Sequence, residues 1–247
     1  MHRVQRAIIM AAGTGKRLRP ITADVPKPLI SINGRRIIDT IIQGLHDNNI
    51  YDIYIVVGYL KEKFQELKKD YSGLHFIDNP YYDCANNISS LYVARDFIEN
   101  AIILDGDQII YNSDILKPDF EKSGYNAVWT DGLTKEWLLQ VQNGRVVSCS
   151  RNGGKKGWQL YSISRWTSND GKRLRKHIVA AFNNNLLHNL YWDDVVMFCY
   201  FEQYDLGIMP MNIDDVKEID NLCELVEIDA HYEKYLGTKL HKMEKLD

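Results

Sequence analysis

The stretch that decides the fold lies near the start of the chain, where residues 7–29 read AIIMAAGTGKRLRPITADVPKPL. Its first part, Ala7–Ala12, is a short apolar run that ends at a glycine, which is typical of a buried parallel strand. Gly13 and Gly15 follow directly, and glycine lets the backbone turn sharply and bring its N–H groups close to phosphate oxygens. The stretch therefore predicts a strand followed by a phosphate-binding loop.

The loop also carries basic side chains that suit a phosphate ligand. Arg17 offers a planar fork of donors, Lys27 offers a compact charge, and Lys16 adds further positive charge. Three prolines stiffen the segment that carries Lys27. Two common phosphate motifs are excluded, because a Walker A loop requires glycine where Met10 stands and a dinucleotide fingerprint requires glycine where Leu18 stands.

Beyond the loop, segments with strand and helix periodicity alternate along the first half of the chain. This alternation predicts an α/β fold with a doubly wound, mostly parallel sheet, and shorter strands after Tyr125 predict a smaller mixed β insertion. We expect further strands at Ile53–Val57, His75–Ile77, Ala101–Leu104, Ala127–Thr130, Leu138–Gln142, Val146–Ser150, Gln159–Ser164, Ile208–Met211 and Leu225–Ile228. We expect helices at Arg36–Asn48, Leu60–Tyr71, Ser89–Ile98, Arg173–Leu187 and Asp194–Phe201.

The composition narrows the class of protein. A net charge of −3 argues against a nucleic-acid-binding partner. The four cysteines form no C-x-x-C pair, which argues against a zinc site and fits a reducing, cytoplasmic compartment. No apolar run approaches the roughly 20 residues that span a bilayer, so we expect no membrane partner. The oligomeric state stays open, as does fusion to a further domain through the polar tail Lys239–Asp247.

Two groups of aspartates are candidate metal ligands. Asp105 and Asp107 follow a buried strand, at the sheet edge where open α/β folds bind ligands, and carboxylates there suit Mg²⁺. A simple turn is the alternative explanation for this pair. Asp193 precedes an apolar helix and would on its own be interpreted as a helix cap. Together with Asp107 it becomes a candidate second ligand.

The loop as a whole resembles the signature of the nucleotidyltransferase family that activates sugar phosphates and related compounds. The matching string is Ala11-Ala12-Gly13-x-Gly15-x-Arg17-Leu18-x-Pro20, followed by Pro26-Lys27-Pro28-Leu29. The resemblance implies that the loop and Arg17 hold a triphosphate, that Lys27 contacts the phosphates during transfer, and that Asp107 binds Mg²⁺. The sequence shows no repeat, linker or low-complexity run, so we expect one domain over residues 1–247, with roughly residues 1–124 as a nucleotide-binding half and 125–247 as an acceptor-binding half.

Within this family the chain looks most like the bacterial phosphocholine cytidylyltransferases. The resemblance includes the string Val56–Lys61 around Gly58, the string Asn86–Tyr92, and Tyr191-Trp192-Asp193, whose aspartate binds metal in those enzymes. It implies that Asn87 and Ser89 lie over the cytosine base. The nucleotide-binding residues expected on these grounds are Ala12, Gly13, Gly15, Lys16, Arg17, Lys27, Gly58, Asn87, Ser89 and Asp105.

The second half of the chain is rich in aromatic residues that suit a cationic acceptor. Trp137, Trp158 and Tyr191 could form a box for a quaternary ammonium, with Glu136 and Asp194 adding negative charge. A primary ammonium would instead require carboxylate or carbonyl acceptors for its N–H groups. Both kinds of group are present, so phosphocholine is favoured by the resemblance, with 2-aminoethylphosphonate, the substrate of similar phosphonate cytidylyltransferases, close behind.

We therefore expect a Mg²⁺-dependent enzyme that transfers CMP from CTP to a phosphorylated or phosphonate amino-alcohol and releases pyrophosphate. The catalytic residues would be Arg17, Lys27, Asp107 and Asp193. A sugar-1-phosphate nucleotidyltransferase, a non-catalytic nucleotide sensor and a glycosyltransferase with an Asp-x-Asp site are the alternatives. The aromatic second half argues against the sugar-1-phosphate enzyme. The intact set of charged residues argues against the nucleotide sensor, and the N-terminal loop argues against the glycosyltransferase.

Overall fold

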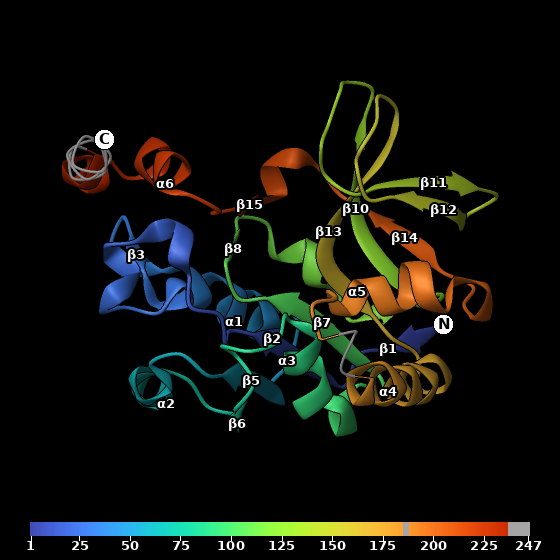
Figure 1. Cartoon of the computed structure of the whole chain (residues 1–247), viewed down its shortest axis with the longest axis horizontal. Coiled ribbons are helices and arrows are strands. Elements are labelled where there is room, and N and C mark those ends of the chain that lie inside the picture. The colour runs from blue at the N-terminus through green and yellow to red at the C-terminus, as the bar shows by residue number, and fades with distance from the viewer. Residues whose placement is uncertain (185–187, 237–247) are drawn as a thin grey trace.

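The computed structural model describes residues 1–184 and 188–236, and its centre is a nine-stranded sheet (Figure 1). Seven strands follow the order β12-β11-β13-β7-β2-β5-β6, and β10 and β14 join through β13. The strands are β2 (Arg6–Met10), β5 (Ile53–Val57), β6 (Leu74–Asp78), β7 (Ala101–Asp105), β10 (Gly124–Thr130), β11 (Leu138–Gln142), β12 (Arg145–Ser150), β13 (Gly157–Arg165) and β14 (Gly207–Pro210).

The directions of these strands confirm the predicted fold class. Strands β7, β2, β5 and β6 run parallel to one another, as alternating strand and helix segments require. Strand β13 then pairs antiparallel with β7, β10 and β11, and β11 with β12, which makes the second part of the sheet mixed. The change of pattern predicted near Tyr125 falls inside this continuous sheet, at β10.

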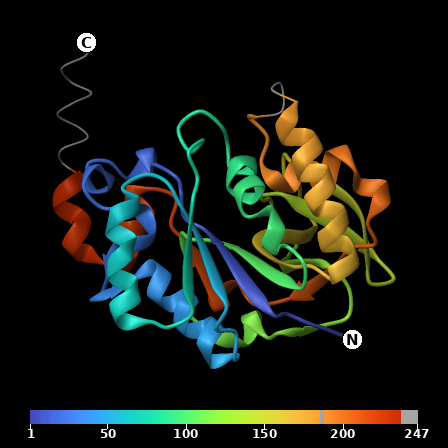
Figure 2. The ribbon, with the colours of Figure 1, turned by 90° about the horizontal axis from the view of Figure 1, so that it is seen from below.

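Helices cover both faces of the parallel part because successive side chains of a strand point to opposite faces. Ala7 and Ile9 of β2 belong to the same apolar cluster as helix α1 (Ile37–Asp47). Ile8 and Met10 belong to the cluster that contains helices α3 (Ile88–Val93) and α4 (Ser168–Asn183). Figure 2 shows the helices on the two sides of the sheet. Across residues 1–184 and 188–236, no helix is long and apolar enough to cross a bilayer.

Several short elements frame the carboxyl ends of the parallel strands. Strand β8 (Gln108–Ile110) pairs antiparallel with β15 (Val216–Glu218), and helix α5 (Trp192–Asp194) precedes a π-helical segment, Val195–Cys199. The remaining short elements are β1 (His2–Arg3), β3 (Ser31–Ile32), β4 (Arg35–Arg36), β9 (Asp119–Phe120), α2 (Leu67–Asp70) and α6 (Leu222–Ile228), with 3₁₀ turns between them.

Five predicted elements differ from the structure. The helix expected at Ser89–Ile98 ends at Val93 and is followed by a 3₁₀ turn at Arg95–Phe97. The strand expected at Leu225–Ile228 is part of helix α6, where Asn221 caps the helix start and the Glu224 side chain accepts hydrogen bonds from the backbone before it. The helix expected at Leu60–Tyr71 is a 3₁₀ helix, Lys61–Glu66, followed by the single turn of α2.

The other two differences concern the acceptor-binding half. The helix expected at Asp194–Phe201 begins earlier as α5 and continues as the π-helical segment. Helix α4 begins five residues before the predicted Arg173, because the Thr167 side chain caps it. Its predicted end falls on residues 185–187, which lie outside the described residues. The tail at 239–247 also lies outside them.

Candidate active site

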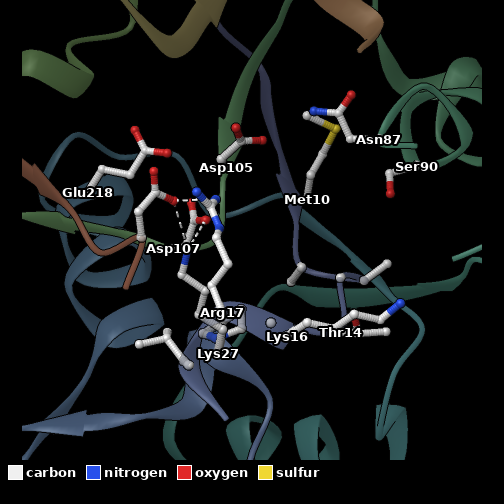
Figure 3. Close-up of a pocket in the computed structure, with 18 of the residues that line it drawn as sticks. Met10, Thr14, Lys16, Arg17, Lys27, Asn87, Ser90, Asp105, Asp107 and Glu218 are labelled. Carbon is white, nitrogen blue, oxygen red and sulfur yellow. Dashed lines mark hydrogen bonds and ion pairs between the residues drawn. The ribbon is translucent and has the colours of Figure 1, made fainter. Parts of the chain in front are cut away.

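The loop after β2 lines a cavity of about 400 Å³ at the carboxyl ends of the parallel strands, which we call the loop cavity (Figure 3). Gly15 adopts a left-handed conformation with φ of +60°, and a Cβ atom there would lie 2.9 Å from Thr22 Cγ2. The Thr22 hydroxyl donates a hydrogen bond to the Gly15 carbonyl and fixes this turn. Six loop residues predicted from the sequence line the cavity: Ala12, Gly13, Gly15, Lys16, Arg17 and Lys27.

Lys27 is the most enclosed of the basic residues in the loop, with 8% of its surface exposed. Its Nζ atom donates a hydrogen bond of 2.6 Å to Asp107 Oδ2 and lies 3.5 Å from Asp220 Oδ1 (Figure 3). Burial disfavours the charged ammonium, but the carboxylate of Asp107 outweighs that effect and raises the pKa of Lys27. The structure therefore holds a charged amine at the end of β7, beside the sheet strand that carries the loop.

Arg17 stands at the mouth of the same cavity. Its guanidinium donates a hydrogen bond of 2.6 Å to Asp220 Oδ1, and its side chain is 70% exposed. Since a guanidinium presents a fork of donors, this side chain can exchange part of its carboxylate contact for phosphate oxygens without moving its backbone. Arg17 and Lys27 thus both pair with the carboxylate of Asp220.

Three carboxylates gather where these basic groups meet. Oxygens of Asp107, Glu218 and Asp220 lie within 4.8 Å of one another, and Asp107 Oδ1 is buried with no hydrogen-bond partner in the described part of the chain. Antiparallel pairing of β15 with β8 places Glu218 opposite Gln108, which explains how residues over a hundred positions apart converge. Clustered carboxylate oxygens suit a hard divalent cation, so this donor set fits Mg²⁺.

The sequence analysis missed Glu218 and Asp220. The only local signal was the alternation Glu218-Ile219-Asp220 after a short strand, which places both carboxylates on the same side of an extended segment. Glu218 opens onto the cavity, where desolvation and the neighbouring carboxylates of Asp107 and Asp220 raise its pKa to about 8. Glu218 therefore keeps its proton to a higher pH than an ordinary glutamate, and a cation would bind to it in competition with that proton.

A second cavity of about 340 Å³ adjoins the first, and we call it the acidic cavity. The two cavities share several lining residues, so a ligand in one would lie beside a ligand in the other. The acidic cavity is lined by five carboxylates together with two aromatic rings: Asp105, Glu136, Asp193, Glu218, Asp220, Trp137 and Tyr191.

Asp105 and Asp193 lie deepest in this region. Burial, followed by the charges of Asp107 and Asp193, raises the pKa of Asp105 well above its ordinary value. Burial raises the pKa of Asp193 to about 7, and its Oδ1 atom has no hydrogen-bond partner among the described residues. Asp193 lines the acidic cavity, but its unpaired Oδ1 atom is buried, and the residue lies apart from the cluster of Asp107, Glu218 and Asp220.

Asp194 differs from its neighbour, because both of its oxygens serve the protein itself. Its Oδ2 atom accepts a hydrogen bond from the Tyr191 backbone N–H and caps α5, and its Oδ1 atom pairs with the guanidinium of Arg151. The side chain is only 4% exposed and does not line the acidic cavity. The acceptor-binding role predicted for Asp194 therefore has no geometric support.

The three aromatic residues predicted to form a box separate into two places. Trp137 and Tyr191 meet edge to face, with ring centroids 6.2 Å apart, and both line the acidic cavity. Trp158 instead packs against Trp129, 5.4 Å away, on neighbouring strands. Trp158 thus belongs to the sheet surface rather than to the cavity.

Three residues predicted to bind the nucleotide take different positions. Asn87 lines both cavities, and its Oδ1 atom accepts a hydrogen bond from the Trp192 backbone N–H. Ser89 is buried and bonded to the Asn86 carbonyl and Asn79, so Ser90 lines the loop cavity in its place. Gly58 lies outside both cavities.

Close packing explains the glycine at position 58. A Cβ atom there would lie 2.8 Å from the Tyr82 side chain, so only glycine lets this aromatic ring pack against the end of β5. The glycine in the string Val56–Lys61 is therefore explained by packing. Together with Tyr59 and Asn79 it lines a separate surface hollow.

Comparison with known proteins agrees with this architecture. Residues 6–123 match the nucleotidyl transferase family model. The chain is 35% identical over 229 residues to a 2-aminoethylphosphonate cytidylyltransferase of Lancefieldella rimae, covering 92% of each chain. A solved CTP:phosphocholine cytidylyltransferase from Streptococcus pneumoniae superposes with a TM-score of 0.85 at 31% identity, over 92% of this chain and 98% of that one. The chain therefore belongs to the nucleotidyltransferase family.

Proposed function

We propose that the protein is a cytidylyltransferase that transfers CMP from CTP to a phosphorylated or phosphonate amino-alcohol and releases pyrophosphate. The observation that carries the proposal is the contact between Lys27 and Asp107, which joins the phosphate-binding loop to the carboxylate cluster at the meeting point of two cavities. Similarity over most of the chain to cytidylyltransferases with such acceptors supports the same reaction.

The loop cavity would receive the nucleotide. Backbone N–H groups of Gly13 and Gly15 approach the β- and γ-phosphates closely, because no side chain intervenes. Arg17 binds the same oxygens with its fork of donors. Asn87 and Ser90 stand on the opposite side of the cavity, where amide and hydroxyl groups can pair with the N4, N3 and O2 atoms of cytosine.

Mg²⁺ is the cation that we assign to the carboxylate cluster. Asp107, Glu218 and Asp220 would hold it, and Asp193 is the further ligand that the sequence resemblance implies, facing the adjoining cavity. When bound, the ion supplies positive charge to the phosphate oxygens near the reacting centre. Lys27 and Arg17 keep the carboxylates oriented through their ion pairs.

Transfer would proceed by attack of an acceptor phosphate or phosphonate oxygen on the α-phosphorus of CTP. A new P–O bond forms as the bond between the α-phosphorus and the bridging oxygen breaks, and pyrophosphate leaves with that electron pair. The attacking group has a second pKa near about 6 and is already anionic at pH 7, so no general base is required. Lys27 offsets the charge that develops at the α-phosphate, and the two adjoining cavities bring the reactants together.

The test is release of pyrophosphate with each of the four nucleoside triphosphates. The acceptors are phosphocholine, phosphoethanolamine, 2-aminoethylphosphonate and glucose-1-phosphate. We expect turnover with CTP and the amino-alcohol acceptors. Activity confined to glucose-1-phosphate would overturn the proposal. We place the reaction in the cytoplasm, because all four cysteines are free thiols.

A further inference from the structure

Arg151 does not itself line the acidic cavity but contacts Trp137, which does, and no part of the proposed reaction uses it. It follows strand β12, and its guanidinium carbon lies 4.4 Å from the ring centroid of Phe198 and 5.6 Å from that of Trp137. The same guanidinium pairs with the buried carboxylate of Asp194. Two aromatic rings and one ion pair therefore hold the guanidinium, although 48% of the side chain is exposed.

The aromatic cluster beside the cavity consequently already holds a cation. Trp137 contacts Phe198 edge to face at 5.4 Å and Tyr191 edge to face at 6.2 Å, so Arg151 shares its rings with the cavity wall. A quaternary ammonium gains its binding free energy from aromatic faces within about 6 Å. A second cation at Trp137 would compete with the guanidinium for the same ring and would be repelled by it, although the ion pair with Asp194 offsets part of that repulsion.

The carboxylates that line the cavity offer a different kind of partner. Glu136 precedes Trp137 in the chain and takes part in no ion pair with another described residue. Asp193 lines the same cavity, although the residue is only 5% exposed and its Oδ1 atom, which has no hydrogen-bond partner among the described residues, is buried. A primary ammonium has three N–H donors for such oxygens, whereas a trimethylammonium has none.

We propose that Arg151 is a specificity-determining residue, which makes the site select acceptors with a primary ammonium over acceptors with a quaternary one. Arg151 lies against the rings of Trp137 and Phe198, and Glu136 receives the ammonium beside Trp137. This inference rests on the proposed cytidylyl transfer and narrows its acceptor. It reverses the order of preference drawn from the sequence, which placed phosphocholine first.

The experiment compares acceptors that differ only in the methylation of nitrogen. Phosphoethanolamine is paired with phosphocholine, and 2-aminoethylphosphonate with its trimethylammonium analogue, and kcat/KM is measured with CTP for each. We expect the unmodified protein to favour the primary amine of each pair at least about tenfold, with the difference mainly in the KM of the acceptor.

Arg151→Met removes the charge and keeps much of the side-chain length. We expect the preference for the primary amine to fall at least about tenfold, chiefly through a lower KM for the quaternary acceptor. Glu136→Gln should raise the KM of the primary amine more than that of its methylated partner. Arg145→Met is the matched control, because Arg145 lies on the same hairpin and pairs with Asp205. Its ratio should equal that of the unmodified protein.

A merely structural role for Arg151 is separated by a second variant. Loss of Arg151 strands the buried carboxylate of Asp194, so the double variant Arg151→Met/Asp194→Asn removes that charge as well and keeps an oxygen to cap α5. If the folded double variant retains the original preference, Arg151 does not set specificity. Equal or better use of the quaternary acceptors by the unmodified protein would also overturn the inference. No transfer to any of the four acceptors would instead refute the proposed cytidylyl transfer.

Discussion

Lys27 Nζ lies 2.6 Å from Asp107 Oδ2, although 80 positions separate the two residues in the chain. The contact exists because β2 and β7 are neighbouring parallel strands, so the segments that follow them leave the sheet at the same edge. It places the amine of the phosphate-binding loop against a carboxylate of the proposed cation site. Each charged group thereby limits where the other can move.

Lys27→Ala should lower turnover by about 100-fold or more, because a preorganised charge at the reacting phosphate typically contributes that much. Steady-state release of pyrophosphate from CTP measures the effect. Arg19→Ala is the control, since Arg19 is an exposed basic residue of the same loop that lies outside both cavities. Near-normal turnover in the folded Lys27→Ala protein would remove this lysine from the mechanism.

Gly15→Ala should weaken the binding of CTP by about tenfold or more. A left-handed backbone costs a residue with a Cβ atom roughly 1 kcal/mol, and that atom would lie 2.9 Å from Thr22 and 3.3 Å from the Cβ of Lys27. The KM for CTP and calorimetric titration report the change. Gly132→Ala serves as the control, because the nearest atom to a Cβ there is 3.8 Å away. Unchanged affinity in Gly15→Ala would show that the loop tolerates a wider turn.

Chelation of divalent cations should abolish turnover, and added Mg²⁺ should restore it. Asp107→Asn and Asp220→Asn should each weaken binding of Mg²⁺ or Mn²⁺ at least about tenfold, because a charged oxygen ligand is lost from the cluster. Titration with Mn²⁺, followed by electron paramagnetic resonance, measures binding apart from turnover. Asp24→Asn, an exposed carboxylate outside both cavities, should leave the affinity unchanged. Tight Mn²⁺ binding by both cluster variants would place the ion elsewhere.

The stability of the acceptor-binding half should depend on pH through His177. Its ring stacks on Tyr200 and shares a hydrogen bond of 2.7 Å with the Tyr204 hydroxyl. Burial lowers the pKa of His177, and the charges of Arg173 and Lys176 lower it further, whereas a hydrogen bond with a glutamine opposes them. A histidine whose pKa is lowered on folding stabilises the protein above the pKa of the unfolded chain, about 6.5. That stabilisation is lost as the pH falls.

The measurement is the difference in free energy of unfolding between the unmodified protein and His177→Gln, taken from pH 8 to pH 5. The free energy of unfolding of the unmodified protein should decrease relative to that of His177→Gln as the pH falls. His2→Gln, at the exposed start of the chain, gives the matched comparison. A difference that is independent of pH would show that His177 binds its proton equally well in both states.

Local sequence information was sufficient for the parallel half of the fold. Ala7–Ala12 and Ile53–Val57 are uninterrupted apolar runs, and only strands buried on both faces require such runs. The loop residues were also predictable, because the glycines and basic residues that contact one ligand are close in sequence. The structure accordingly places all of these loop residues around a single cavity.

The part of the site that is formed by residues far apart in the sequence was harder to predict. Glu218 and Asp220 join Asp107 through the pairing of β15 with β8, and a three-residue strand carries too little periodicity to be predicted. Arg151 lies in the turn after β12, and the residues that it contacts, Trp137, Asp194 and Phe198, are 14 to 47 positions away in the chain. Leu225–Ile228 was wrongly predicted as a strand, since a short apolar run does not distinguish a strand from a capped helix.

Three hydrogen bonds connect the nucleotide-binding half of the chain to the acceptor-binding half and couple their mobility. The Asn86 side chain donates to the Asn189 carbonyl, its backbone N–H donates to the His188 carbonyl, and Asn87 accepts from the Trp192 N–H. These three bonds tie the start of α3, beside the proposed cytosine site, to the segment that carries the acceptor-side aspartate. Ordering of Asn87 by a bound cytosine would therefore lower the conformational entropy of that segment. Binding of CTP would in this way favour subsequent binding of the acceptor.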